Sequence, residues 1–316
     1  MDNFLFLPRA LTAALYDIAF AVTFGLVLVD RWLSVEEEEH LRRELLLAAV
    51  LGASGLLLAL VVQCWTTTAT VIGSSDIPSV SGQFTSVLTG THAGRVLLSE
   101  CLLAILLAAW LTFRYAQSAC LGTWNSLGLL FLMAATRAAT GHPAAEGDFT
   151  LPEFAQLVHL VSISTWAGCV IAAGLVVLPA LVRDRPIESM TRFLRKLSRA
   201  VAFALLLVVL SGIYNSCRGL GGTVTPLLGT QWGRLLDLKL ALVSIAAALG
   251  LLNRRMVHSS RDLSVNNVAR LMMMMRAEAI LMLLILAVSA FLANSPPTNL
   301  STTSCRPGLP TPSLPS

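Results

Sequence analysis

The sequence predicts an all-α, polytopic membrane protein with eight transmembrane helices. Hydrophobic residues make up 55% of the 316-residue chain and charged residues only 13%, whereas charged residues form about 25% of soluble domains. Several apolar runs reach the ~20 residues that a helix needs to cross a hydrocarbon core. These runs are continuously apolar and do not alternate with a period of two, which favours helices over a β-barrel.

The eight expected spans are separated by polar or charged stretches. They cover residues 10–29, 45–65, 96–113, 121–136, 154–181, 199–216, 235–252 and 272–293. The fourth span is short, and the fifth is long enough to tilt or to protrude from the membrane. The first run has no early small-residue cleavage site, so we expect it to be a retained helix and not a signal peptide.

Basic residues mark alternate loops. They gather between spans one and two, three and four, five and six, and seven and eight, whereas the loop at 66–94 contains no Lys or Arg. By the positive-inside rule both termini then lie outside the cytoplasm, which is the periplasm for a bacterial inner membrane. The net charge of +4 therefore indicates orientation, not nucleic-acid binding.

The two halves of the chain share short patterns. The sequences THAGR at 91–95 and TQWGR at 230–234 precede spans three and seven, and Phe24-Gly25 corresponds to Trp166-Ala167-Gly168. Four helices per half preserve orientation, so we expect a 4+4 parallel pseudo-repeat. The predicted units are an N-terminal half at 1–140, a C-terminal half at 141–295 and a disordered periplasmic tail at 296–316, rich in Ser, Thr and Pro.

Histidines are the candidate metal ligands. His142 lies just before span five, His159 lies near its outer end, and His92 lies on a loop of the same side. Imidazoles at a membrane mouth suit Cu(I), Cu(II) or Zn(II). On a helix, His159, Trp166 and Cys169 fall within an arc of about 80°, so Trp166 and Cys169 are possible auxiliary groups. Helix–helix packing is the alternative explanation of this polar stripe.

Three further ionisable residues fall within expected spans. Asp17 in span one is a possible auxiliary oxygen ligand. Glu100 and Lys239 occupy matched positions of the two TxxGR patterns. A lone charge there is costly, so we expect both to face the interior and to form an ion pair, with separate snorkelling or local partners as the alternative. The six cysteines show no CxxC spacing and are expected to act as small hydrophobes.

A series of motifs in the C-terminal half resembles the copper resistance D (CopD) family of bacterial inner-membrane proteins. The resemblance is clearest over residues 135–293. Two positions depart from the family pattern: Cys169 replaces a second glycine, and Glu100 stands where a basic residue is more usual. The motifs are Gly141-His142, His159 with Trp166 and Gly168, Phe193-x4-Ser198, Ser211-Gly212, Thr230-x2-Gly233-Arg234-x4-Lys239 and Asn253-Arg254-Arg255.

The resemblance implies copper movement across the inner membrane, inward, in partnership with a periplasmic copper carrier of the CopC type. It also implies that His142 and His159 match the family's histidines. We expect no enzymatic activity, and the absence of a GxxxxGK[ST] motif excludes a P-loop ATPase within this chain. Two alternatives stay open: a haem-binding electron carrier, which would need facing histidines in the bilayer, and a copper-holding sensor or assembly partner that does not transport.

Overall fold

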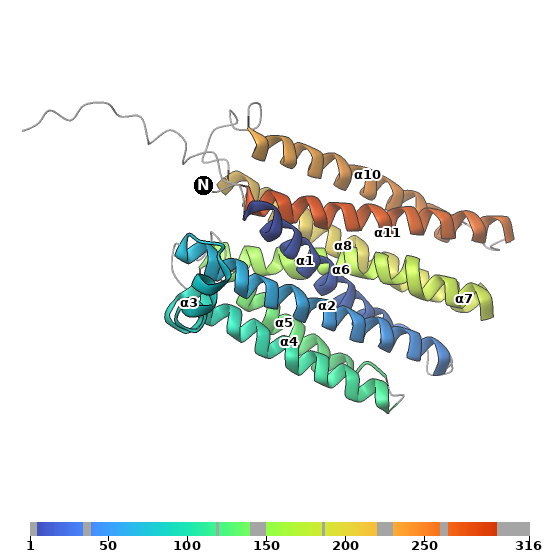
Figure 1. Cartoon of the computed structure of the whole chain (residues 1–316). Helices are drawn as coiled ribbons and strands as arrows, with labels where there is room; N and C mark the ends of the chain where they lie inside the picture. Colours follow the sequence, from blue (N-terminus) through green and yellow to red (C-terminus); the bar gives the residue numbers. More distant parts are fainter. Residues whose placement is uncertain are drawn as a thin grey trace, which may run out of the picture.

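The computed structural model describes residues 5–33, 39–117, 120–139, 150–184, 187–219, 230–259 and 265–295, and its regular segments there are all helical (Figure 1). The expected all-α class is therefore confirmed for this part of the chain. The elements are α1(Phe6–Asp30), α2(Glu39–Ile72), α3(Ile77–Gly90), α4(His92–Ala116), α5(Thr123–Ala138), α6(Leu151–Ala172), η2(Ala173–Val177), α7(Leu178–Asp184), α8(Ile187–Gly219), α10(Gln231–Ser259) and α11(Val265–Asn294).

Seven helices within the described ranges are long and apolar enough to cross a membrane. They correspond to seven of the eight expected spans. The remaining one, α5, has 16 residues and a length of ~24 Å at 1.5 Å per residue, which is less than the ~30 Å hydrocarbon core. The multi-pass character is thus established, whereas the count of eight spans stays a prediction.

The long fifth span contains a change of helix type. A π-helical turn, η2, separates α6 from α7, and the N–H of Leu178 bonds to the carbonyl of Ala173, five residues earlier. Pro179 follows directly. Proline has no N–H to donate, and its ring collides with the carbonyl four residues back. A local π-bulge accommodates it without ending the helix.

The stretch at 66–94 is more structured than a loop. α2 continues to Ile72, and α3 occupies residues 77–90. The carboxylate of Asp76 accepts a hydrogen bond from the N–H of Ser79 at 3.2 Å, and Pro78 lies in the first turn. These are helix-start signals. The short amphipathic helix then buries Val80, Val87 and Leu88.

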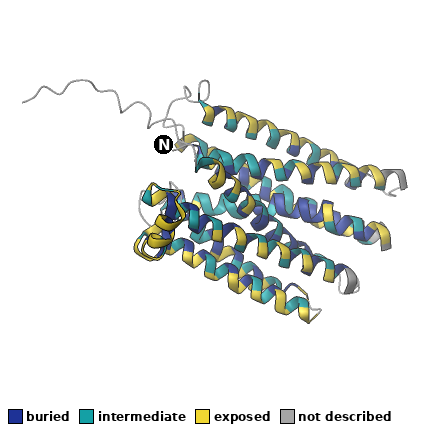
Figure 2. Cartoon of the chain, viewed as in Figure 1, coloured by how far each residue is buried: buried dark blue, intermediate teal, exposed yellow. Residues whose placement is uncertain are grey.

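The centre of the bundle is formed by α1 and α6, which are its most buried spans (Figure 2). Gly25 of α1 lies against the backbone of Gly168 in α6, and a side chain on either glycine would overlap the facing helix. Small residues let transmembrane helices approach this closely. The contact brings together the two segments that the sequence comparison aligned.

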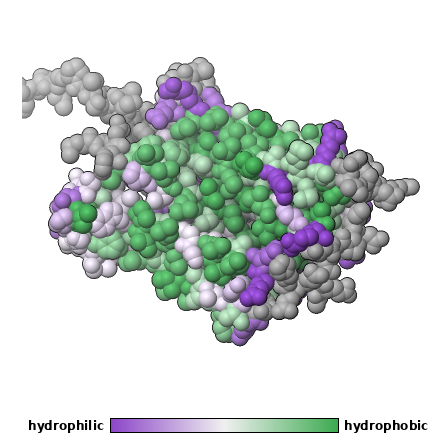
Figure 3. All heavy atoms as spheres, turned by 45° about the vertical axis from the view of Figure 1, so that its right-hand side comes forward, coloured by the Kyte–Doolittle hydropathy of each residue, from purple (hydrophilic) through white to green (hydrophobic). Residues whose placement is uncertain are grey.

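Both ends of the described chain lie at one end of the bundle, which we call the terminal end. The rings of Phe6 and Phe291 are 6.2 Å apart, and Figure 1 shows the start of α1 beside the end of α11. Figure 3 shows hydrophobic residues covering the middle of the surface, with hydrophilic residues gathered toward its ends. An apolar band of this kind is what a bilayer requires.

Candidate functional site

His159 lies near the terminal end of α6 and is half-buried. Its Nδ1 lies 3.0 Å from the hydroxyl oxygen of Ser211 on α8. That hydroxyl donates its own proton to the carbonyl of Leu207, at 2.6 Å, so it accepts from His159. We therefore assign the proton of the neutral ring to Nδ1, which leaves a lone pair on Nε2. A hydrogen bond at one ring nitrogen commonly orients the other toward a metal.

A polar seam continues from His159 toward the terminal end. Asn215 donates to the side-chain carbonyl of Gln156 at 3.0 Å, about one helical turn beyond the pair of His159 and Ser211. Gly212 packs beside the imidazole, since a Cβ added there would lie 3.6 Å from Cε1 of His159, an ordinary van der Waals contact. The interface of α6 and α8 is therefore hydrophilic at the terminal end.

Charged side chains from two other helices lie near this seam. Asp17 of α1 and Lys239 of α10 attract each other electrostatically, and Lys239 also acts electrostatically on His159. The helix register explains why Asp17 lies near His159. α1 and α6 run in the same direction and touch at Gly25 and Gly168; Asp17 lies eight residues before Gly25, and Leu160 lies eight residues before Gly168. Asp17 and His159 are consequently at the same depth.

Glu100 has a different partner from the one we expected. Its carboxylate lies 3.6 Å from Nη1 of Arg137 on α5. Arg137 also donates to the side-chain oxygen of Gln63 at 2.9 Å and lies over the ring of Tyr16, 4.3 Å from its centroid. No ion pair joins Glu100 to Lys239 within the described residues, and that expectation was wrong. The reason is packing: α4 packs against α2 and α5, whereas α10 packs against α11.

Of the other two predicted histidine ligands, the described residues include His92 but not His142. His92 is exposed at the first residue of α4. His142 falls outside the described residues, as do the tail at 296–316 and the boundary at 141. Within the ranges described above, no group of three His, Cys, Asp or Glu side chains is arranged to hold a metal ion. A metal site formed by His142, His159 and His92 together therefore stays a prediction.

Trp166 and Cys169 are both fully buried, but they lie in different parts of the core. Cys169 packs in the cluster that includes Phe20 and Phe24 of α1. Trp166 packs in a second cluster with Ala246 of α10 and Met282 of α11, and it lines a cavity. The residues of the stripe predicted on α6 thus face different neighbours: Cys169 faces α1, and Trp166 faces the cavity.

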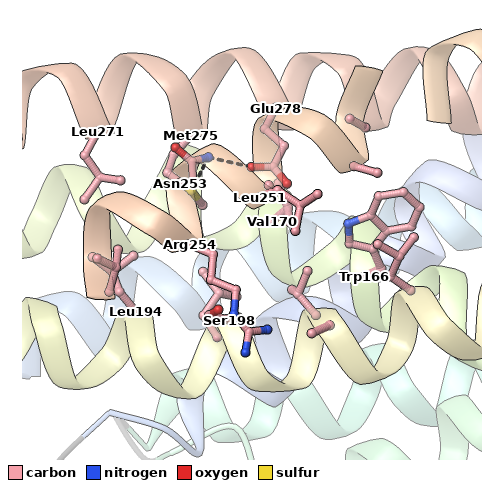
Figure 4. A pocket seen from close by; sticks show the side chains of 18 residues that line it. Trp166, Val170, Leu194, Ser198, Leu251, Asn253, Arg254, Leu271, Met275 and Glu278 are labelled. Carbon is pink, nitrogen blue, oxygen red and sulfur yellow. Dashed lines mark hydrogen bonds between the residues drawn. The ribbon is translucent and has the colours of Figure 1, made fainter. Parts of the chain in front are cut away.

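The cavity lies between α6, α8, α10 and α11, has a volume of about 90 Å³, and extends from Trp166 toward the end opposite the termini (Figure 4). One wall is polar. Asn253 donates to a carboxylate oxygen of Glu278 at 2.7 Å and lies 3.4 Å from the thioether sulfur of Met275. Both polar residues are buried. An ionisable group inside a span is costly and marks a functional site by default.

Our sequence reasoning did not identify this second site. The signals were present, since Asn253 begins one of the quoted motifs and Glu278 is the one acidic residue of the expected span at 272–293. The bundle therefore contains two polar sites: His159 on α6 near the terminal end, and Glu278 deeper, in the cavity that α6 and α8 form with α10 and α11.

Comparison with known proteins gives matches in both halves of the chain. The family model described as copper resistance protein D matches residues 191–292. The model described as copper resistance protein D-like, N-terminal domain, matches residues 5–151. The chain belongs to the copper resistance protein D family. The matched regions of this family contain Ser211, Lys239, Asn253 and Glu278 in one part and Glu100 in the other, whereas His159 lies between them.

A curated relative is the copper resistance protein D of Pseudomonas syringae pv. tomato, 34% identical over 123 residues, which are 38% of this chain and 40% of the relative. The alignment therefore spans less than half of either protein. No solved structure matches the chain significantly.

Proposed function

We propose that this chain moves copper inward across the bacterial inner membrane, taking it from a periplasmic carrier of the CopC type. The observation that carries the proposal is the environment of His159. Its Nδ1 donates to Ser211, so the Nε2 lone pair is available as a ligand, and imidazole nitrogen suits copper in either oxidation state. Family membership supports copper as the cargo.

His142 and His92 complete the proposed entry site. His92 begins α4 at the terminal end, and His142 belongs to the segment between α5 and α6. In the proposed orientation this end faces the periplasm, because the basic residues of the last turns of α4 and α7, Arg114 and Arg183, lie at the other end. A carrier would then deliver copper at the terminal end.

The cavity deeper in the bundle extends the proposed route. α6 carries His159 and, seven residues further, Trp166, which lines the cavity. A carboxylate at Glu278 and a thioether at Met275 supply one hard and one soft donor. We propose that copper passes from the entry site along α6 to this cavity.

Uptake by proteoliposomes tests this proposal. Wild-type protein should accumulate copper from outside, and His159→Ala should lower the rate at least tenfold because the site loses an imidazole ligand. Thr165→Val is the matched control on the same helix, because the Thr165 hydroxyl bonds only to the local carbonyl of Val161 within the described structure. Equal uptake by wild type and His159→Ala contradicts the proposed entry site.

A binding measurement separates transport from mere retention. Equilibrium dialysis in detergent gives the copper affinity independently of movement across a membrane. A wild-type protein that binds copper through His159 but takes up none would be a copper-holding sensor or assembly partner, and the transport proposal would be wrong.

A further inference from the structure

Two cysteines of the N-terminal half face each other across a helix interface. The sulfur atoms of Cys64 on α2 and Cys101 on α4 are 3.8 Å apart. Both are free thiols; Cys64 is buried and Cys101 is half-buried. Neither residue belongs to the entry site or to the cavity around Glu278. They are separated by 37 residues, so no local motif in the sequence reveals the pair.

The depth of the pair is similar on both helices. Cys64 comes eight residues before the end of α2 at Ile72, and Cys101 comes nine residues after the start of α4 at His92. At 1.5 Å per residue the sulfurs lie ~12–14 Å from the terminal end of each helix. The pair is therefore inside the membrane-spanning part of the bundle.

The separation of the sulfurs suits one shared metal ion. Metal–thiolate bonds are about 2.3 Å long, as in zinc sites. Two sulfurs on one ion are then about 3.8 Å apart at a tetrahedral angle and about 4.6 Å apart when they are opposed. The observed 3.8 Å falls at the start of this range, and a small outward shift of the two side chains reaches the rest of it.

The surroundings select the kind of metal. Structural zinc takes four protein ligands, but no third His, Cys, Asp or Glu is arranged around these thiols in the part of the chain described. Two thiolates are a sufficient ligand set for Cu(I), a soft ion that accepts low coordination numbers. Apolar residues of the same two helices, including Leu60, Leu97 and Ala104, belong to the same core cluster as Cys64, and the nearby carboxylate of Glu100 is already paired with Arg137.

The charge of the complex has a cost. Cu(I) with two thiolates carries one net negative charge, which is unfavourable inside a membrane unless an opposite charge lies close. Arg137 is already paired with the carboxylate of Glu100, next to Cys101, so a bound Cu(I) would have to draw on the charge of this guanidinium in competition with Glu100.

We propose that Cys64 and Cys101 form an intramembrane Cu(I) site in the N-terminal half. Binding forms two S–Cu bonds and releases the two thiol protons to solvent. The inference rests on the proposed function in one respect, the identity of copper as cargo. It adds a second copper-binding site, formed by two thiolates and separate from the histidine entry site.

The test is a Cu(I) titration of the full chain in detergent against a chromogenic Cu(I) chelator. Protein is first reduced with a phosphine, and its free thiols are counted. Cys64→Ser and Cys101→Ser should each bind one Cu(I) fewer than wild type, and the double variant should bind no fewer than either single one. Cys217→Ser, at an exposed position, is the matched control and should bind as wild type does. X-ray absorption should show two sulfur ligands for the copper that the serine variants lose.

Unchanged stoichiometry in both serine variants overturns the site. So does a preparation in which the two sulfurs stay bonded to each other after reduction and bind no copper. The readout is independent of transport: a dithiol site in a protein that takes up no copper leaves this inference standing and overturns the proposed function. Loss of uptake in His159→Ala together with an unchanged Cu(I) stoichiometry in both serine variants has the opposite meaning: it supports the proposed function and overturns this inference.

Discussion

The guanidinium of Arg137 lies 3.6 Å from the carboxylate of Glu100, which is 1% exposed. The pair bridges α5 and α4 inside the N-terminal half. A buried carboxylate in a span needs a counter-charge, and α5 provides it from the last turn of the helix that our span analysis considered short. The ion pair therefore attaches α5 to α4, although α5 is shorter than the hydrocarbon core.

Breaking this pair should destabilise the protein. We expect Glu100→Gln and Arg137→Gln each to lower the free energy of unfolding by roughly 3 kcal/mol, because each leaves one buried charge uncompensated. The double variant should recover much of the loss, since coupled sites are not additive. Thermal unfolding in detergent measures the effect. Glu44→Gln, in the exposed pair with Arg183, should cost less than about 1 kcal/mol, and additive losses in the double variant would contradict the coupling.

Removing the hydroxyl of Ser211 should weaken copper binding without removing a ligand. Ser211→Ala deprives Nδ1 of His159 of its acceptor, so the ring loses its fixed orientation. Changes to groups that orient metal ligands commonly cost 10–100-fold in affinity, and we expect a decrease within that range by equilibrium dialysis. Ser289→Ala removes a hydroxyl that bonds to the carbonyl of Ile285 in its own helix. Equal affinities of the two variants would disprove the role of Ser211.

The polar wall of the cavity allows a second coupling experiment. Asn253→Leu leaves the buried carboxylate of Glu278 without its donor, and we expect a loss of about 2 kcal/mol in the free energy of unfolding. Asn253→Leu combined with Glu278→Leu should be more stable than Asn253→Leu alone. Asn294→Leu serves as the control, because its amide bonds only to a carbonyl at the end of α11 in the described structure. The pairing is excluded if the double variant unfolds more readily than the single one.

Reporter fusions test the orientation. The contact of Phe6 with Phe291 places both described ends on one side of the membrane, and the basic loops predict that this side is the periplasm. An alkaline phosphatase fused after Ser316 should be active, and a fluorescent protein that matures only in the cytoplasm should be dark. The reverse pattern would show that the assignment of sides is inverted or that one span is miscounted.

The helices could be predicted from sequence because continuous apolar runs have few alternatives in a bilayer. Their ends could not: α2 and α8 extend well beyond the apolar cores at 45–65 and 199–216. Polar residues at helix ends lie in the headgroup region or in water, where hydropathy carries no signal. α3 was missed for the same reason, since its Ser, Thr and Gly content is typical of a loop.

The sequence predicted how far along its helix each candidate residue lies, but not which residues on other helices it contacts. The span boundaries predicted that His159 lies near one end of its span, and the structure has it near the start of α6, at the terminal end; that this end is the outer one stays a prediction. The pairing of Glu100 with Lys239 failed because a sequence repeat indicates equal depth, whereas an ion pair also requires neighbouring helices. Lys239 is near Asp17 instead. The partner of Glu278 comes from another helix, 25 residues away in the chain, and no periodicity reports such a contact.

The contact of Gly25 with Gly168 restricts how the two halves could move. No side chain separates the two backbones there, so the halves cannot part at that depth without opening a void. The same contact sets the spacing of α1 and α6 at neighbouring depths. Asp17 and His159 lie eight and nine residues before it on these two helices, so a side chain introduced at either glycine would also change the distance between the backbones that carry Asp17 and His159.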